Sequence, residues 1–547
     1  MAKRYRGVDR DQPFLLPPDM REWLPAEHPV WLVIRVVDEH LDTSAFHAGR
    51  RTGGAGAAGY DPDMLAAVLV WAYAHRVTSS RRIEELCRTD VAFRVICGGN
   101  LPDHATIARF RADFADTVAG FFAEVLGLCA ALEMGRLGVV ALDGTKVAAS
   151  ASKAANRTED GLRKLAAETV AAHAQADVAE DALFGGARGD EVPEDAWRPG
   201  RRDERIAAAL ASLQAERAAA ERAERDAAAE FLARRAAGDR TGPVPLAVAV
   251  QVAEENLERA RAAQQAKVDR WRATDAAARR AGQNRRGGRP AAADDYIRVR
   301  EARAVLERAR ARVAAAGARA AEREQRRRGP GPVRNITDPD SRLMPVSGGG
   351  FIQGYNAQNV TSEDGLILAT QLTQDTGDVA WFEPMTAAAE DAAALIAARR
   401  QPGAGGEPGG DREGGYRIGL VLADAGYLSE HNLTCGGPDR LIAVGNRRDL
   451  ETATRGGTAG GRPAGPAITA MAARLRADAG MTAYRHRGHV AETPHARIKH
   501  GMAFRQLSMR GKRKTAAEWA FTCAVTNLFK AITSGHLTTH ALAALAR

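Results

Sequence analysis

The chain has 547 residues and a formal net charge of +9, with 45% hydrophobic and 27% charged residues. This length allows three or four domains of about 150 residues and a sizeable core. Its five cysteines are scattered without a CxxC pair, which excludes zinc-finger spacing and favours reduced thiols. The longest apolar run, Leu65 to Ala74, is too short to span a bilayer, and no signal segment is evident. We therefore expect a soluble, intracellular protein without a membrane partner.

Residues 1–135 are expected to be helical. Pro62 stands at the start of one apolar-faced segment, and Ser79 or Ser80 can cap the next. A third segment starts around 102–106 and carries Arg109 and Arg111. Short helices with tight turns fit a helix-turn-helix-like DNA reader, and an ordinary helical bundle fits equally well.

Residues 136–154 are expected to form one strand with an acid at its end. The run Val139 to Leu142 is apolar and is followed by Asp143 and Gly144. A carboxylate at the end of a buried strand is poorly solvated, so it needs a partner to offset the cost of its charge. A lone Asp there is also a common strand end or helix cap.

Residues 155–335 have a different composition, dominated by Ala, Arg and Glu. We expect three long helical tracts, broken near 238–243 and 282–290. The last tract spaces small and apolar residues as a heptad seam: Val299, Ala302, Leu306, Ala309, Val313 and Ala316. Because half of these are Ala, the seam needs a partner helix from this segment or from another subunit.

Residues 336–547 show an α/β pattern. We expect a strand pair at 351–358 and 365–370, then a helix at 379–398. Strands should follow at 418–423 and 441–444, and a further helix at 467–477. The order predicts a mixed sheet with helices on its faces. The strand at 418–423 ends in Asp424, Ala425 and Gly426, which repeats the design around Asp143.

The segment 481–530 concentrates positive charge. It holds ten Lys and Arg against only Glu492 and Glu518, a net charge of +8. A solvated basic face is one explanation. Beside acidic strand ends, this charge favours a polyanionic substrate, with nucleic acid the leading candidate.

These features together resemble bacterial insertion-sequence transposases of the DDE type, in the branch with an N-terminal helical domain. The resemblance covers most of the chain outside 155–335, and its motifs gain specificity from their order. The matching stretches are 102–111, 140–146, 335–341, Gly354-Tyr355-Asn356-Ala357-Gln358, 424–427 and 492–499.

The resemblance implies an RNase H-like core interrupted by the 155–335 insertion, with the acidic triad Asp143, Asp424 and Glu492. These residues would bind two Mg²⁺ or Mn²⁺ ions, which prefer oxygen ligands and promote phosphodiester cleavage and transfer. The partners would be double-stranded DNA, at the element's inverted repeats and at the target, and further copies of the chain. The protein would act in the bacterial cytoplasm at the nucleoid.

The third acid lies in a motif that the family spaces as Tyr, Arg, Glu and Lys. Glu492 and Lys499 fit this spacing and share a helix face. Tyr484 and Arg487 fit it between themselves, but Arg487 lies one residue further from Glu492 than the pattern expects. His495 shares the face and is a weaker metal candidate. Pro494 favours a helix that starts close to Glu492.

Alternative acids have simpler explanations. We expect a surface or helix-end role for Glu518 and a helix-start role for Glu430. Further basic residues are candidates for contact with the DNA backbone: Arg447, Arg448, Arg510, Lys512, Arg513 and Lys514.

An active transposase that cleaves and joins DNA is the reading we favour. An inactive DNA-binding or scaffold derivative, and a hydrolytic nuclease with the same core, are the alternatives.

Overall fold

The computed structural model describes residues 19–48, 59–113, 115, 117–184, 200–239, 242–282, 288–326, 332–346, 349–400, 417–445, 458–459, 462–463 and 465–545. The chain divides into two compact units. One contains residues 1–155 and 337–547, and the other contains residues 156–336. Each unit is described by itself.

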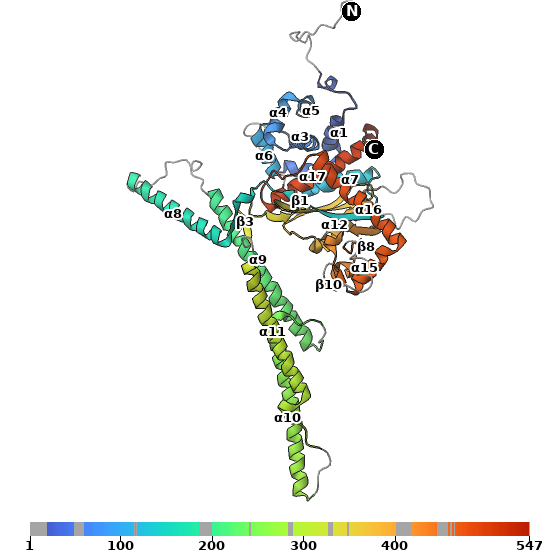
Figure 1. The fold of residues 1–547 in the computed structure, drawn as a ribbon. Coiled ribbons are helices and arrows are strands. Elements are labelled where there is room, and N and C mark those ends of the chain that lie inside the picture. Colours follow the sequence, from blue (N-terminus) through green and yellow to red (C-terminus); the bar gives the residue numbers. More distant parts are fainter. Residues whose placement is uncertain are drawn as a thin grey trace, which may run out of the picture. The chain divides into compact units, whose positions relative to one another are not determined.

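The first unit begins with helices, as the sequence predicts for residues 1–135. They are α1 (Pro29–Arg35), α2 (Ser44–His47), α3 (Pro62–Ala74), α4 (Ser80–Thr89), α5 (Val91–Ile96), α6 (His104–Asp113) and α7 (Val118–Ala131) (Figure 1). Pro62 occupies the first turn of α3, where its missing N–H costs nothing, and Asp61 caps that helix. Ten of the thirteen residues of α3 are buried, so it is the central helix of this bundle.

Among the described residues, no single helix is long and apolar enough to cross a membrane. The helices α6 and α7 reach that length and composition only as a pair, and they meet at 83°.

A six-stranded mixed sheet follows the helices. Its strands are β1 (Val139–Ala148), β4 (Arg342–Pro345), β5 (Phe351–Ser362), β6 (Ile367–Thr373), β7 (Leu420–Ala423) and β8 (Asp439–Ile442). The order is β4-β5-β1-β7-β8, with β6 also paired to β5. β1 is antiparallel to β5 and parallel to β7, and β7 is parallel to β8. The mixed sheet and all five expected strands are confirmed, with shifts of a few residues at the ends of most of them.

Helices cover both faces of this sheet. On one face lie α16 (Asp478–Ala496) and α17 (Lys512–Thr533), since Trp519 of α17 donates to Asn359 opposite Asp143. On the other face lies α12 (Phe382–Arg399), as Figure 1 shows. Its Phe382 packs against Tyr427, which bonds to Gln358 opposite Gly144.

Smaller elements complete the unit. They are α13 (Glu430–Thr434), α15 (Pro466–Arg476), α18 (Thr539–Leu545) and a two-residue strand pair, β9 (Thr458–Ala459) with β10 (Arg462–Pro463). The helices expected at 379–398 and 467–477 correspond to α12 and α15.

The second unit, residues 156–336, is almost entirely helical. It contains α8 (Glu159–Phe184), α9 (Gly200–Ala236), α10 (Ala249–Arg280) and α11 (Ile297–Arg326). The expected breaks near 238–243 and 282–290 are present. The prediction of three tracts is wrong for the described residues, because α8 and α9 are separate helices. The short strands β2 (Asn156–Thr158) and β3 (Val333–Asn335) pair antiparallel and bring the two ends of the unit together.

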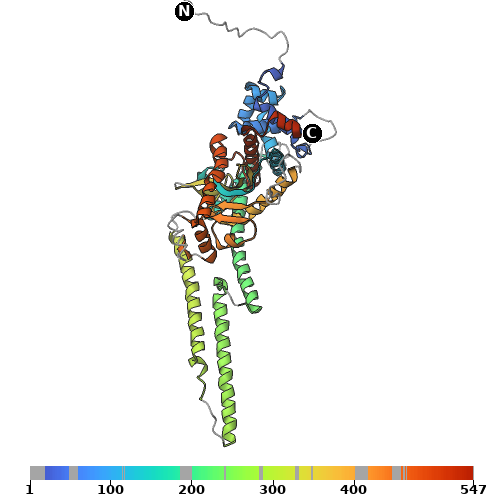
Figure 2. The same ribbon diagram turned by 90° about the vertical axis from the view of Figure 1, so that its right-hand side faces the viewer.

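α10 and α11 lie side by side, as Figures 1 and 2 show. They run antiparallel, because Arg310 pairs with Glu254 while Arg303 and Arg261 both pair with Asp294. Within the predicted seam of α11, Val299 and Leu306 are buried, but Val313 is 38% exposed. The buried seam therefore covers only the part of α11 near the turn.

Candidate active site

The two aspartates are neighbours in the sheet. Asp424 follows the end of β7, as expected, but the prediction that β1 ends at Asp143 is wrong, because β1 continues to Ala148 by pairing with β5. β1 and β7 are parallel, and their last paired residues are Leu142 and Ala423. Asp143 and Asp424, the next residue on each strand, therefore lie side by side. The C-terminal end of β7 therefore lies beside the Asp143 carboxylate in the middle of β1.

Arg487 of α16 bridges the two carboxylates. Its Nη2 lies 3.0 Å from Asp143 Oδ1 and 3.5 Å from Asp424 Oδ2. The Arg487 side chain is 17% exposed and that of Asp143 16%, so this pairing occurs with little solvent. Arg487 therefore belongs to the site, despite the extra residue that separates it from Glu492.

Burial raises the pKa of Asp143 to about 6. The positive charge of Arg487 opposes this shift, while the negative charges of Asp424 and Glu492 add to it. Two aspartates and a glutamate near one another thus make ionisation of Asp143 costly. Such a cluster is typical of sites that bind a cation.

Glu492 is exposed on α16, and no hydrogen bond or ion pair of its carboxylate is seen within the described part of the chain. The helix begins at Asp478, so the expectation that it starts near Glu492 is wrong. Pro494 lies in the last turn instead. Its ring removes a backbone donor, and the helix continues as a π-helical segment from Arg497 to Gly501.

This π-helical segment carries Lys499 to the sheet. Its ammonium donates a hydrogen bond to Thr145, two residues after Asp143 and on the same face of β1. Burial lowers the pKa of Lys499, and the charge of Asp143 opposes that shift. At the other end of α16, the Tyr484 hydroxyl donates to the Ala423 carbonyl at 3.1 Å. Tyr484, Arg487 and Lys499 therefore all contact β1 or β7.

His495 lies beneath the same cluster. It is buried, with Nε2 3.8 Å from Asp143 Oδ2, and neither ring nitrogen has a hydrogen-bond partner among the described residues. Burial, helped by the charge of Lys499, lowers the pKa of His495 to about 4. The imidazole is neutral at physiological pH and close enough to contact a group bound at Asp143.

A third aspartate, Asp378, which was not predicted from the sequence, lies just before α12. It accepts hydrogen bonds of 2.7 Å from both Asn356 and Gln358, and Lys146 lies 3.4 Å away. These partners explain the polar residues of Gly354-Tyr355-Asn356-Ala357-Gln358. A signal was present, because two amide side chains alternate along an otherwise buried strand and require a polar partner.

Asp378 approaches from the opposite face of the sheet. A Cβ on Gly144 would lie 2.8 Å from Asp378 Oδ1, and one on Gly426 would lie 3.1 Å from its Oδ2. Gly144 follows Asp143 directly and Gly426 lies two residues after Asp424, so the Asp378 carboxylate lies close to the backbone beside both acids.

Two predictions about residues outside the triad are wrong. Arg111 does not face solvent: it is 7% exposed and forms an ion pair of 3.0 Å with Glu518. Glu518 is 2% exposed in the interior of α17, so it has neither a surface nor a helix-end role. Its carboxylate also accepts bonds from Tyr73 and from the backbone N–H groups of Ser508 and Met509.

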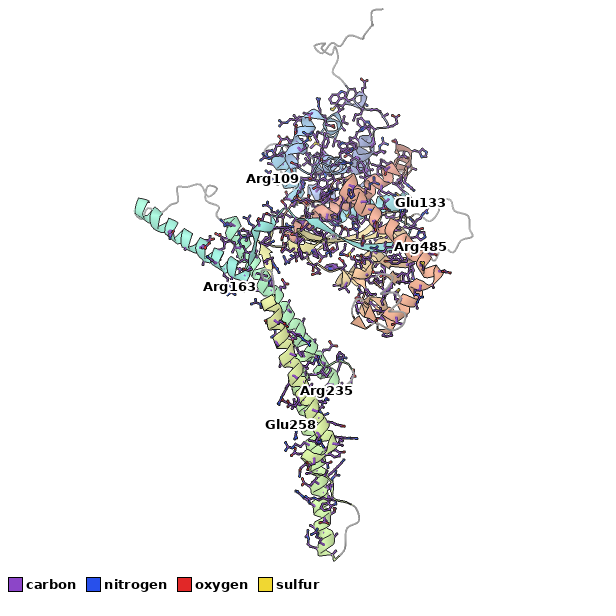
Figure 3. The ribbon with its side chains drawn as sticks, viewed as in Figure 1. Arg109, Glu133, Arg163, Arg235, Glu258 and Arg485 are labelled. Carbon is purple, nitrogen blue, oxygen red and sulfur yellow. The ribbon has the colours of Figure 1, made fainter. Side chains whose placement is uncertain are left out.

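Other predicted residues lie on surfaces. Arg109 is exposed on α6 (Figure 3). Arg510, Lys512 and Arg513 are exposed at or before the start of α17, and Lys514 is half-buried. Glu430 begins α13, as expected, and its carboxylate accepts from the first backbone N–H groups of α15. Arg447 and Arg448 lie outside the described residues.

The residues present are of the kind that binds a divalent cation, although among the described residues the oxygens of Asp143, Asp424 and Glu492 are not all gathered as closely as around a bound ion. Asp143 and Asp424 provide neighbouring carboxylates that now share a single guanidinium, and Glu492 is near enough to influence Asp143. Carboxylate oxygens are the ligands that Mg²⁺ and Mn²⁺ prefer.

Two segments of the chain match known families. The model for the Transposase domain (DUF772) matches residues 18–113, the helical start of the first unit. The model for the Transposase DDE domain matches residues 464–532, which include Tyr484, Arg487, Glu492 and Lys499. Asp143 and Asp424 lie outside both segments. No curated protein and no solved structure gives a significant match.

Both models describe transposase domains. On these two segments the chain is similar to transposases, and the match supports its resemblance to insertion-sequence transposases of the DDE type.

Proposed function

We propose that this transposase cuts and joins DNA at the ends of its own insertion sequence, with Asp143, Asp424 and Glu492 as its acidic triad. The observation that carries the proposal is the placement of Asp143 beside Asp424, with Arg487 across both carboxylates. A sheet with one acid on its central strand, a second at the end of the neighbouring strand and a third on a helix over it is the arrangement of an RNase H-like core.

The triad would hold two Mg²⁺ or Mn²⁺ ions, which supply activation of the attacking oxygen and stabilisation of the leaving oxygen. The chain's own residues hold the DNA. Lys499 is positioned by Thr145 to meet a phosphate beside Asp143. Tyr484 fixes α16 against the end of β7 through the Ala423 carbonyl. Arg487 keeps the carboxylates close together.

The proposed partners follow from this chemistry. The helical N-terminal part would bind duplex DNA at the terminal repeats, with Arg109 exposed for contact. Arg510, Lys512, Arg513 and Lys514 would meet the phosphate backbone. Arg447 and Arg448 are proposed on sequence alone. The protein would act as a homo-oligomer on DNA, in the bacterial cytoplasm at the nucleoid.

The test replaces each acid by its amide: Asp143→Asn, Asp424→Asn and Glu492→Gln. Each should abolish Mg²⁺- or Mn²⁺-dependent cleavage and strand transfer on DNA that carries the element's end. DNA binding should persist or tighten, because a charge that repels phosphate is gone. The three losses should be of similar size, because residues that act as one site are not additive.

Glu430→Gln is the matched control, since this acid lies near Asp424 but is used at the start of α15, and it should remain active. If all three triad variants remained active, the proposal that these residues catalyse cleavage would be refuted. Cleavage without strand transfer in the unmodified protein would favour the nuclease alternative. DNA binding without cleavage would favour the inactive derivative.

A further inference from the structure

A large excess of positive charge lies in the second unit, on residues to which no function has been assigned above. Residues 259–319, here called the arginine hairpin, contain 17 basic and 6 acidic side chains, a net charge of +11. The chain as a whole carries +9, so all other residues together sum to −2. Without this hairpin the chain would be slightly acidic overall, even though residues 481–530 carry +8.

The charges of the hairpin are exposed. Of its 17 basic residues, 15 fall within the described parts of the chain, and every one of these is exposed. They lie on α10, on α11 and on the connection between them, and side chains project on both sides of the two helices (Figure 3).

The acids of the hairpin neutralise only some of these arginines. Asp294 pairs with both Arg261 and Arg303, while Asp275 pairs with Arg279. Asp269 and Glu307 each pair with an arginine three residues away. Other arginines remain exposed with no ion pair among the described residues: Arg270, Arg280, Arg298, Arg300, Arg308 and Arg319.

We infer that the arginine hairpin is a DNA-binding surface that contacts the phosphates of duplex DNA. Sixteen of its 17 basic residues are Arg, whose planar guanidinium bonds to phosphate with two parallel N–H groups. α11 has 30 residues and is about 45 Å long, more than one turn of duplex DNA. DNA carries about one negative charge every 1.7 Å, so a charged rod of this length meets many phosphates.

A second copy of the chain is the rival partner. Residues 156–258 hold 14 basic and 21 acidic side chains, a net charge of −7 that could attract the hairpin of another copy. The arginines are not confined to one stripe of the helices. This distribution suits a polyanion such as DNA, which can bind from any side, better than a protein partner, which would need one complementary face.

The test uses the full-length chain and a 40-base-pair duplex of arbitrary sequence. Arg270, Arg280, Arg298 and Arg308 are changed together to Gln, and Kd is measured between low and moderate salt. Each lost phosphate contact should reduce the slope of log Kd against log salt by about 0.9. The control variant changes Arg202, Arg222, Arg225 and Arg234, four exposed arginines of α9, and should leave the slope unchanged.

Equal slopes for the hairpin variant and the unmodified protein would overturn the inference, as would an equal fall in the control. Sedimentation without DNA tests the rival: loss of a salt-sensitive oligomer in the hairpin variant, with an unchanged DNA slope, would assign the surface to a second copy. The inference relies on the proposed function only for the choice of DNA. Variants of the acidic triad should keep the unmodified slope of log Kd against log salt. A failure of the proposed catalysis can therefore be distinguished from a failure of the proposed DNA binding by the hairpin.

Discussion

Asp143 is the residue whose electrostatics bear most directly on the site. Its pKa is raised to about 6 from an ordinary 3.8, mainly by burial. Because the folded protein holds this proton more tightly than the unfolded chain, ionisation costs stability. The cost appears as pH rises from about 4 and is complete above about 6.

Asp143→Asn should therefore stabilise the protein when divalent ions are removed. A shift of about two pKa units corresponds to a stabilisation on the order of 3 kcal/mol above pH 6, and the gain should vanish below about pH 4. Urea unfolding in EDTA at pH 7.5 and pH 4 measures this difference. A variant that is less stable at pH 7.5 but not at pH 4 would show that the pairing of ionised Asp143 with Arg487 outweighs the cost of burial.

The sequence predicted the residues of this site unevenly. Asp424 follows a short apolar strand and Asp143 follows an apolar run within β1, a local pattern that needs no knowledge of the fold. Arg111 looked like a surface residue because nothing in its helix reveals a partner 407 positions away. Asp378 was missed because its partners come from another strand, and pairing register is set by the whole sheet.

At the scale of elements, α17 packs between the N-terminal helices and the sheet. Its Glu518 contacts α3 and α6, and its Trp519 contacts β5. The Glu518 carboxylate is buried and accepts from Arg111, Tyr73 and the backbone before α17. Hydrophobic packing surrounds it, with Phe521 against both Tyr73 and Phe121.

Glu518→Ala should destabilise the protein by about 3–5 kcal/mol, because it leaves the Arg111 guanidinium buried without its charge partner. The double change Arg111→Met with Glu518→Leu should recover much of that loss, since apolar side chains replace the pair. Thermal unfolding of the single and double variants provides the comparison. A single variant within about 0.5 kcal/mol of the original would show that water reaches Arg111.

Strands and helices were predicted best where their pattern is local. Period-two and apolar runs located β5, β6 and β7 within a few residues. The start of α16 was wrong because Pro494 was read as a helix beginning, whereas the helix tolerates it in the last turn. The division between α8 and α9 was missed although the sequence carries a signal for it, because Gly185, Gly186, Pro193 and Pro199 lie between these helices and are poor helix formers.

At the scale of the molecule, the first and last residues of the second unit lie next to each other. Asn156 pairs with Asn335 and Thr158 with Val333, so chain entry and exit are neighbouring strands. Paired strands lie about 5 Å apart, a gap that a few residues can cross.

Replacing residues 159–332 by four glycines should therefore leave the first unit folded. Its thermal transition should move by less than a few degrees, because its core contains no residue of the second unit. Circular dichroism should show the loss of helix that α8 to α11 contribute, with the remaining transition still cooperative. Loss of a cooperative transition would show that the two units fold together.

Arg487 gives the resting site a built-in counterion. A guanidinium that neutralises Asp143 and Asp424 has to be displaced, at least in part, before those oxygens can coordinate anything else. A DNA phosphate offers Arg487 another anionic partner, so binding of DNA and loading of metal should help each other. By thermodynamic reciprocity, the factor by which DNA improves metal affinity equals the factor by which metal improves DNA affinity. In the absence of DNA, the same guanidinium would neutralise the two carboxylates and so disfavour the binding of metal ions by Asp143 and Asp424.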